Sequence, residues 1–223
     1  MNKHNLHVSA MVQIGRLTTN IHLENLATLL PISNNILYIE YGSKINKGIN
    51  PKHIPKKKRL KKNFFYNQVT IHIHCKKRVN MKIFNNGRIQ MTGINYKTHG
   101  GESIQLLINE IHKLSEDSKK EIFDSDSIQQ GNDVETVLIN SDFDIQFKID
   151  REILHRLIVD DGYYSSYEPC TYPGVNIKYY HNPIINNSGI CDCEQPCNGK
   201  GKDNTCKKIT IAVFKSGKII ITG

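Results

Sequence analysis

The amino-acid sequence predicts an α+β fold built from two repeats of one unit of strands and helices. Three observations support this prediction: a segment of 15 residues recurs 130 residues later, apolar residues alternate around a glycine turn in both copies, and amphipathic helical patterns stand beside each copy. A chain of 223 residues is long enough for one substantial core or for two small fused cores.

The repeat is clearest around the two glycine turns. Val79–Gly93 reads VNMKIFNNGRIQMTG, and Ile209–Gly223 reads ITIAVFKSGKIIITG. At one constant offset of 130, key positions of the two copies match, as in Phe84 and Phe214, Gly87 and Gly217, Arg88 and Lys218, and Thr92 and Thr222. A constant offset through so many positions indicates an internal duplication.

Each copy is typical of two antiparallel strands joined by a tight turn. In the first copy Met81 and Ile83 alternate with Lys82 and Phe84, so one face of the hairpin must cover a core. The opposite face mixes aromatic, aliphatic, amide and hydroxyl groups from both copies: Phe84, Gln90, Thr92, Ala212, Phe214, Ile220 and Thr222.

Helices are expected over Thr19–Leu30, Gly101–Leu114 and Asp150–Ile158. The middle one places Ile104, Leu107, Ile108, Ile111 and Leu114 on one face and should lie on the core side of the sheet. The acidic, polar stretch 116–133 is predicted to link a first repeat, residues 1–115, to a second, residues 134–223.

The formal net charge of +9 is concentrated in one segment, since seven cations and no acid lie between Lys52 and Lys62. This basic insertion, about 44–63, is either a nuclear-localisation or DNA-backbone patch or a solvated loop. The chain has no apolar run of the roughly 20 residues that span a bilayer, and its N-terminus is polar. We therefore expect no membrane partner and a nuclear or cytoplasmic location.

Four of the six cysteines lie in a second insertion, about 184–207, as Cys191, Cys193, Cys197 and Cys206. The spacing C-x-C-x3-C-x8-C permits a tetrahedral structural Zn²⁺ site, and unliganded cysteines are the alternative. No other cofactor is expected. His72, His74 and the acidic residues form no catalytic arrangement, so we do not expect an enzyme.

Three motifs resemble TATA-box-binding proteins. Tyr164–Gly174, YSSYEPCTYPG, is similar to FSSYEPELFPG of that family, VFKSGKIIITG is similar to IFVSGKVVLTG, and IFNNGRIQMTG is similar to IFSSGKMVCTG. The resemblance implies a pseudo-twofold saddle, in which a curved antiparallel sheet faces DNA and helices cover its convex side. It also implies a transcription initiation factor that binds and bends AT-rich, TATA-like DNA through the minor groove.

The resemblance assigns roles residue by residue. Four aromatic side chains correspond to the wedges that the family inserts between base steps, namely Phe65, Phe84, Tyr172 and Phe214. For the fourth wedge Phe65 is favoured, and its neighbours Phe64 and Tyr66 are the alternatives. Thr92, Thr222, Ile220 and Gln90 correspond to contacts at the groove floor, and Arg88, Lys178 and Lys218 to phosphate contacts. Glu168 and Pro169 lie in the loop that recruits transcription factor IIB.

By the same resemblance, the expected partners are double-stranded AT-rich DNA, IIB-like and IIA-like factors or viral equivalents, and RNA polymerase machinery. Abundant Asn, Ile and Lys suggest an AT-rich genome, such as that of a large DNA virus or a protist. The location would then be the nucleus, or a cytoplasmic viral factory or virion.

The chain also departs from the family pattern. Ala10 and Leu138 stand where the family has central asparagines, with Asn140 nearby, and Lys82 and Ala212 replace leucines that support the wedges. The family continues into a final helix beyond the position of Gly223, and Cys170 and Thr171 replace Glu and Leu in the IIB loop. These departures favour an alternative, a regulatory or interaction protein that kept the saddle but lost DNA bending.

Overall fold

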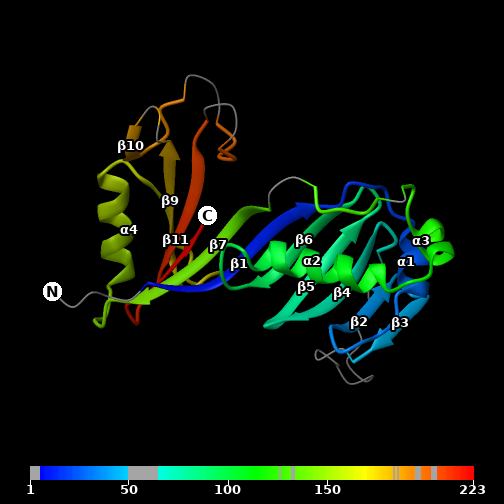
Figure 1. The fold of residues 1–223 in the computed structure, drawn as a ribbon. Coiled ribbons are helices and arrows are strands. Elements are labelled where there is room, and N and C mark those ends of the chain that lie inside the picture. The colour runs from blue at the N-terminus through cyan, green and yellow to red at the C-terminus, as the bar shows by residue number, and fades with distance from the viewer. Residues whose placement is uncertain are drawn as a thin grey trace. The chain divides into compact units, whose positions relative to one another are not determined.

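The computed structural model describes residues 6–49, 65–125, 127–131, 134–182, 184, 186–193, 197–201 and 205–223. The chain forms two compact units. The first unit is Met11–Val137, and the second unit is Met1–Ala10 together with Leu138–Gly223. Figure 1 shows the helices and strands of each unit.

The first unit is an antiparallel sheet with helices on one face. Its strands follow the order β1-β6-β5-β4-β2-β3 across the sheet. The elements are β1 (His7–Arg16), α1 (Leu23–Leu29), β2 (Ile36–Tyr41), β3 (Ile45–Gly48), β4 (Gln68–Cys75), β5 (Lys77–Phe84), β6 (Arg88–Ile94), α2 (His99–His112) and α3 (Glu116–Ile122).

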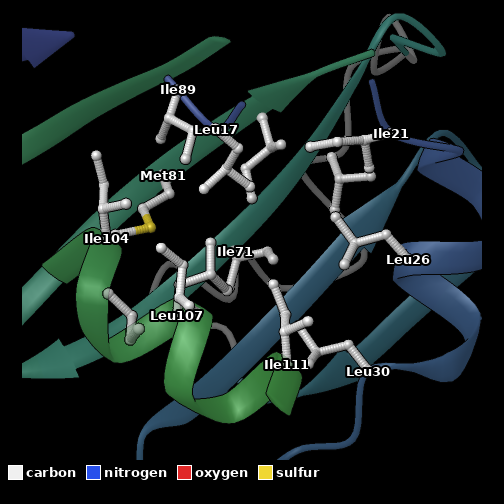
Figure 2. Close-up of a cluster of buried hydrophobic side chains, with 14 of the residues drawn as sticks. Leu17, Ile21, Leu26, Leu30, Ile71, Met81, Ile89, Ile104, Leu107 and Ile111 are labelled. Carbon is white, nitrogen blue, oxygen red and sulfur yellow. The ribbon is translucent and has the colours of Figure 1, made fainter. Parts of the chain in front are cut away.

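The predicted hairpin and helix build the core of this unit. In β5 and β6, Met81 pairs with Met91 and Ile83 with Ile89, and all four side chains are fully buried. Figure 2 shows Ile104, Leu107 and Ile111 of α2 directed at this side of the sheet. The helical spacing thus predicted the buried face of α2 correctly.

The second unit repeats this arrangement. Its sheet order is β10-β9-β11-β12-β7, and β8 pairs with the same edge of β9 as β10, opposite β11. The elements are β7 (Glu135–Asp144), α4 (Arg151–Asp160), β8 (Tyr164–Ser166), β9 (Val175–Asn182), β10 (Asn186–Gly189), β11 (Lys207–Val213) and β12 (Lys218–Thr222). The α+β class and the two hairpins predicted from the sequence are confirmed.

Hydrogen bonds at the two hairpin turns reveal how closely the units correspond. In the first unit Leu17 N donates to Gly87 O at 2.9 Å, and Ile21 N donates to Asn85 O at 2.7 Å. In the second unit the equivalent bonds run from Ile145 N to Gly217 O at 3.1 Å and from Ile149 N to Lys215 O at 3.0 Å. Each turn is therefore anchored to the segment that follows the first strand of its unit.

The two cores differ greatly in size. Among the described residues, the core cluster of the first unit contains 24 buried hydrophobic side chains, whereas that of the second contains only Val175, Ile177 and Val213. Helix α4 has no buried residue, and its Ile153 and Leu157 are about half exposed at 47% and 54%.

Some boundaries differ from the sequence-based expectation. The first expected helix begins only at Leu23, because residues 19–22 make backbone contacts with the β5–β6 turn and with the segment after α3. The stretch 116–133 contains α3, capped where Ser115 Oγ accepts from Ser118 N, and it delivers Ile122, Phe123 and Ile128 to the first core. Apolar residues next to the acidic ones make this stretch part of the unit.

The basic insertion lies mostly outside the described residues. Of the range 44–63, the structure describes residues 44–49, where β3 extends the sheet beside β2. In the described part of the chain, no helix is both long and apolar enough to cross a membrane.

Candidate nucleic-acid interface

Each sheet has one face away from its helices, which we call the open face. In the first unit, one row of paired residues crosses this face through Ile14, Gln90, Lys82 and Thr70. The equivalent row in the second unit runs through Asp142, Ile220, Ala212 and Asn176. The strand alternation predicted from the sequence assigned Gln90, Lys82, Ile220 and Ala212 to this face correctly.

Four of the predicted contact residues lie on the open face of the first unit. Arg88 and Thr92 are exposed, and Phe84 and Gln90 are half-buried. Strand pairing places Arg16 of β1 directly beside Arg88, and Arg16 is exposed too. Arg16 could not be identified from sequence patterns, because Arg88 is 72 positions away in the chain and the two cations become neighbours only when β1 pairs with β6.

The fourth wedge was assigned to one of three adjacent aromatic residues, of which Phe64 lies outside the described residues. The Tyr66 ring packs edge-on against Tyr41, with centroids 5.8 Å apart, and its hydroxyl is 2.8 Å from Ser43 Oγ. Phe65 is 61% exposed and precedes Gln68, the strand partner of Phe84. Of the two described rings, Phe65 is the more exposed, because Tyr66 is 49% exposed and packs on Tyr41.

In the second unit the two predicted wedges meet. The rings of Tyr172 and Phe214 lie 5.8 Å apart between centroids and at 63° to each other. Gly174 leaves room for them, because a Cβ at this position would be 3.0 Å from Tyr172 Cε1 and 3.2 Å from Phe214 Cε1. An aromatic pair thus lies at the turn end of the β11–β12 hairpin.

The loop that carries Tyr172 is held by a residue the sequence analysis did not single out. Arg151, at the start of α4, places its guanidinium 5.2 Å from the Tyr167 ring centre and donates to Pro173 O. Tyr172 N also donates to Glu168 O at 2.9 Å. Glu168 and the adjoining Pro169, the predicted partner-binding residues, are both exposed on this loop.

The predicted phosphate contacts of the second unit are partly engaged within the protein. Lys178 Nζ donates to Thr210 Oγ1 at 3.0 Å on the neighbouring strand, and burial lowers the pKa of Lys178. Lys218 Nζ lies 3.4 Å from Asp142 Oδ2. Both lysines are on the open face, but each already has a partner.

Asp142 is an unexpected feature of this face. Its Cα partner is Ile220, and its Oδ1 lies 3.3 Å from His7 Nδ1. The hydrogen bond with His7, together with the charge of Lys218, holds the pKa of Asp142 below its usual value. Asp144 pairs with Lys218 in the next row and is exposed. Both carboxylates oppose the approach of a polyanion.

The structure also places an asparagine on the open face. Asn140, rather than Leu138 or Ala10, is the strand partner of Thr222, and Val12 has the equivalent position beside Thr92. Within the described part of the chain, no group donates to the Oδ1 of Asn140 or of Asn176. Both oxygen atoms are buried beneath their neighbours, so they are not open to a ligand in this structure.

The four cysteines of the second insertion come together. Their sulfur atoms all lie within 4.8 Å of one another, with Cys193 and Cys206 at 3.5 Å and Cys206 and Cys191 at 3.8 Å. All four are free thiols, as are the separate Cys75 and Cys170. The N–H of Gly199 donates to the Cys197 sulfur and lowers the pKa of that thiol to about 7.

Comparisons with known proteins agree with the motifs. No protein-family model matches the chain. A "TATA-box-binding protein-like" protein of Acanthamoeba polyphaga mimivirus is 30% identical over 246 aligned residues, which take in the whole chain and 61% of that relative. The chain thus spans less than two thirds of the relative's length.

A solved structure shares the fold. The Methanococcus jannaschii TBP matches with a TM-score of 0.55 and 18% identity over 98% of this chain and 87% of its own length. The α+β fold class expected from the motifs is therefore shown. The predicted resemblance to TATA-box-binding proteins is confirmed, in sequence by the mimivirus relative and in fold by the archaeal protein.

Proposed function

We propose that the chain is a general transcription initiation factor that binds AT-rich, TATA-like promoter DNA in the minor groove and bends it. The observation that carries this proposal is the paired rings of Tyr172 and Phe214 at the turn end of one hairpin, with Phe84 at the matching turn of the other. Aromatic side chains that enter between base steps unstack and kink a duplex, and a bent duplex contacts more protein surface.

The chemistry of the open faces suits AT-rich DNA. The minor groove of an A·T pair presents only the acceptors A N3 and T O2, whereas a G·C pair adds the guanine amino group. Thr92 and Thr222 carry hydroxyl donors on the open faces, and Ile220 supplies an apolar surface against which a guanine amino group would lose its hydrogen bonds to water. Arg16 and Arg88 then supply phosphate contacts, which position the duplex without reading its sequence.

The loop 167–174 supports a role in assembly. Glu168 and Pro169 are exposed beside the aromatic pair, on a loop that Arg151 fixes from α4. On this proposal DNA and an IIB-like partner, with IIA-like factors and RNA polymerase machinery, assemble around the chain in the nucleus or in a viral factory.

One observation favours a second function. Asp142 and Asp144 place two carboxylates on the open face of the second unit, and Lys218 is paired with one of them. Acidic residues on the open face repel DNA, but they would not hinder a protein that uses this face to bind a regulatory partner and does not bend DNA.

Gel-shift and circular-permutation assays test the two functions. Wild type should prefer and bend a TATA-like duplex over a G·C-rich one of equal length. Replacing both Phe84 and Phe214 by alanine should abolish the bend and weaken binding at least tenfold, or about 1.4 kcal/mol.

Phe147→Ala is the matched control, because Phe147 is a 60% exposed phenylalanine in the loop between β7 and α4. It should bind and bend like wild type. Wild-type protein that shows no preference for the TATA-like duplex would contradict the first function and leave the interaction protein.

A further inference from the structure

We propose a structural metal site where β9 ends and β11 begins. One Zn²⁺ ion is bound there by four thiolates, those of Cys191, Cys193, Cys197 and Cys206. This site is independent of the DNA-binding proposal, because it lies in the second insertion and uses none of the open-face residues. The ligand is a single divalent cation that prefers sulfur in tetrahedral geometry.

The sulfur positions fit a tetrahedron around one ion. Zn–S bonds of about 2.3 Å at tetrahedral angles place neighbouring sulfurs about 3.8 Å apart. The sulfurs of Cys193 and Cys206 are 3.5 Å apart, those of Cys206 and Cys191 are 3.8 Å apart, and no pair of the four exceeds 4.8 Å. A disulfide needs about 2.05 Å between sulfurs, so the same positions do not describe two disulfides.

Backbone hydrogen bonds hold the segment after the third ligand beside the segment that carries the fourth. Gly201 N donates to Cys206 O at 3.0 Å and Lys208 N donates to Gly199 O at 2.9 Å, which sets Cys197 opposite Cys206. Gly199 and Gly201 both have φ of +69°, a conformation that side chains rarely adopt. The N–H of Gly199 points at the Cys197 sulfur, 3.4 Å away, as a donor to a thiolate should.

The other two ligands, Cys191 and Cys193, follow a strand on the opposite edge of β9 from β11. Cys191 and Cys193 follow β10, which pairs with β9, while Cys206 directly precedes β11. The pairing of β9 with β11, with His181 opposite Lys207, fixes the distance between these arms. Residues distant in sequence are thereby brought to one point by regular strand pairing.

A metal ion would also stabilise the cysteine insertion, whose described residues contribute no side chain to a hydrophobic core. Within the described residues, the second unit has a core of three buried side chains, none of them from the cysteine insertion. Cys206 is only 2% exposed and contacts sulfur atoms rather than a hydrocarbon cluster. Metal binding supplies folding free energy to segments that cannot bury a core of their own.

The test is metal content. Full-length protein purified under reducing conditions should carry one zinc per chain by native mass spectrometry and by plasma emission. The double variant Cys191→Ser/Cys206→Ser should carry none, and a strong chelator should lower the melting temperature of wild type while leaving that of the double variant unchanged. Cys170→Ser, at an exposed cysteine outside the cluster, is the matched control and should keep its zinc.

If the double variant does not fold, Co²⁺ exchanged into wild type provides the second measurement, because a tetrahedral Co²⁺ tetrathiolate has characteristic visible absorption. Each of four outcomes would overturn the proposal. They are iron in place of zinc, a cobalt spectrum without thiolate ligands, two disulfides in protein purified under reducing conditions, and zinc retained by the double variant. None of these outcomes bears on DNA bending, so the two proposals fail independently.

Discussion

The carboxylate of Asp142 stands between His7 and Lys218 on the open face of the second unit. The sequence identified Lys218 as a phosphate contact from its match with Arg88, but it could not show that a carboxylate one strand away already engages it. The two cationic positions are therefore unequal: Arg88 adjoins another cation, Arg16, whereas Lys218 adjoins an acid.

We expect Asp142→Asn to strengthen DNA binding about three- to tenfold, or roughly 0.7–1.4 kcal/mol, because the change removes a negative charge and releases Lys218 for a phosphate. The dependence of log K on log salt should steepen by about one. Fluorescence anisotropy over a salt series measures both quantities. Asp160→Asn, an exposed acid at the end of α4, is the charge-matched control and should change affinity much less.

Unaltered affinity in Asp142→Asn would mean that the open face of the second unit does not meet DNA. Equal gains in Asp142→Asn and Asp160→Asn would mean that only the net charge of the protein matters.

At the scale of elements, the hairpin turn is the feature that the two units share most closely. Gly217 has φ of +92°, and a Cβ there would lie 2.3 Å from Phe147 O. Gly87 has φ of +79°, and a Cβ there would lie 2.6 Å from both Leu17 O and Thr19 O. Both turns thus require glycine for two reasons, a left-handed backbone and close approach to backbone carbonyls.

Gly217→Ala should destabilise the protein by at least about 2 kcal/mol, since alanine costs roughly 1–2 kcal/mol in the left-handed region before any steric clash is added. Urea unfolding of the full chain measures the change. Gly101→Ala is the opposite control, because Gly101 lies in α2, where a Cβ would meet its nearest neighbour at 3.8 Å, an ordinary van der Waals contact, and alanine there should stabilise by up to about 1 kcal/mol. Wild-type stability in Gly217→Ala would refute the requirement for glycine at this turn.

In the whole molecule, the duplication has produced two units whose hydrophobic cores differ in size. The β-strand order and the turn hydrogen bonds correspond, but α1, α2 and α3 all contribute buried side chains to the first core, whereas α4 buries none. Hydrophobic burial is the main source of stability, so local stability should follow core size.

We expect amide hydrogen exchange to be slowest in β4, β5 and β6 and at least about tenfold faster in β11 and β12, a difference of about 1.4 kcal/mol in opening free energy. Mass spectrometry on peptic fragments of the full chain measures this directly. Equal protection in the two hairpins would show that the small core of the second unit is not its limiting feature.

Local sequence patterns were enough to predict the duplication, both hairpins, the buried face of α2 and the faces on which Phe84, Thr92 and Ile220 lie. These features depend on local periodicity, because side chains alternate strictly along a strand and recur every 3.6 residues along a helix. The motifs likewise identified Tyr172 and Phe214 without any knowledge of their distance.

The neighbours of a residue on adjacent strands are known from the three-dimensional pairing alone. Arg16 beside Arg88, Asn140 beside Thr222, Asp142 beside Lys218 and the four sulfurs within 4.8 Å all follow from register and hairpin pairing between segments far apart in the chain. A shift of one residue in the register of a strand would turn the side chains of that strand to the opposite face. The composition of the open faces is therefore set by long-range pairing, which local sequence patterns do not encode.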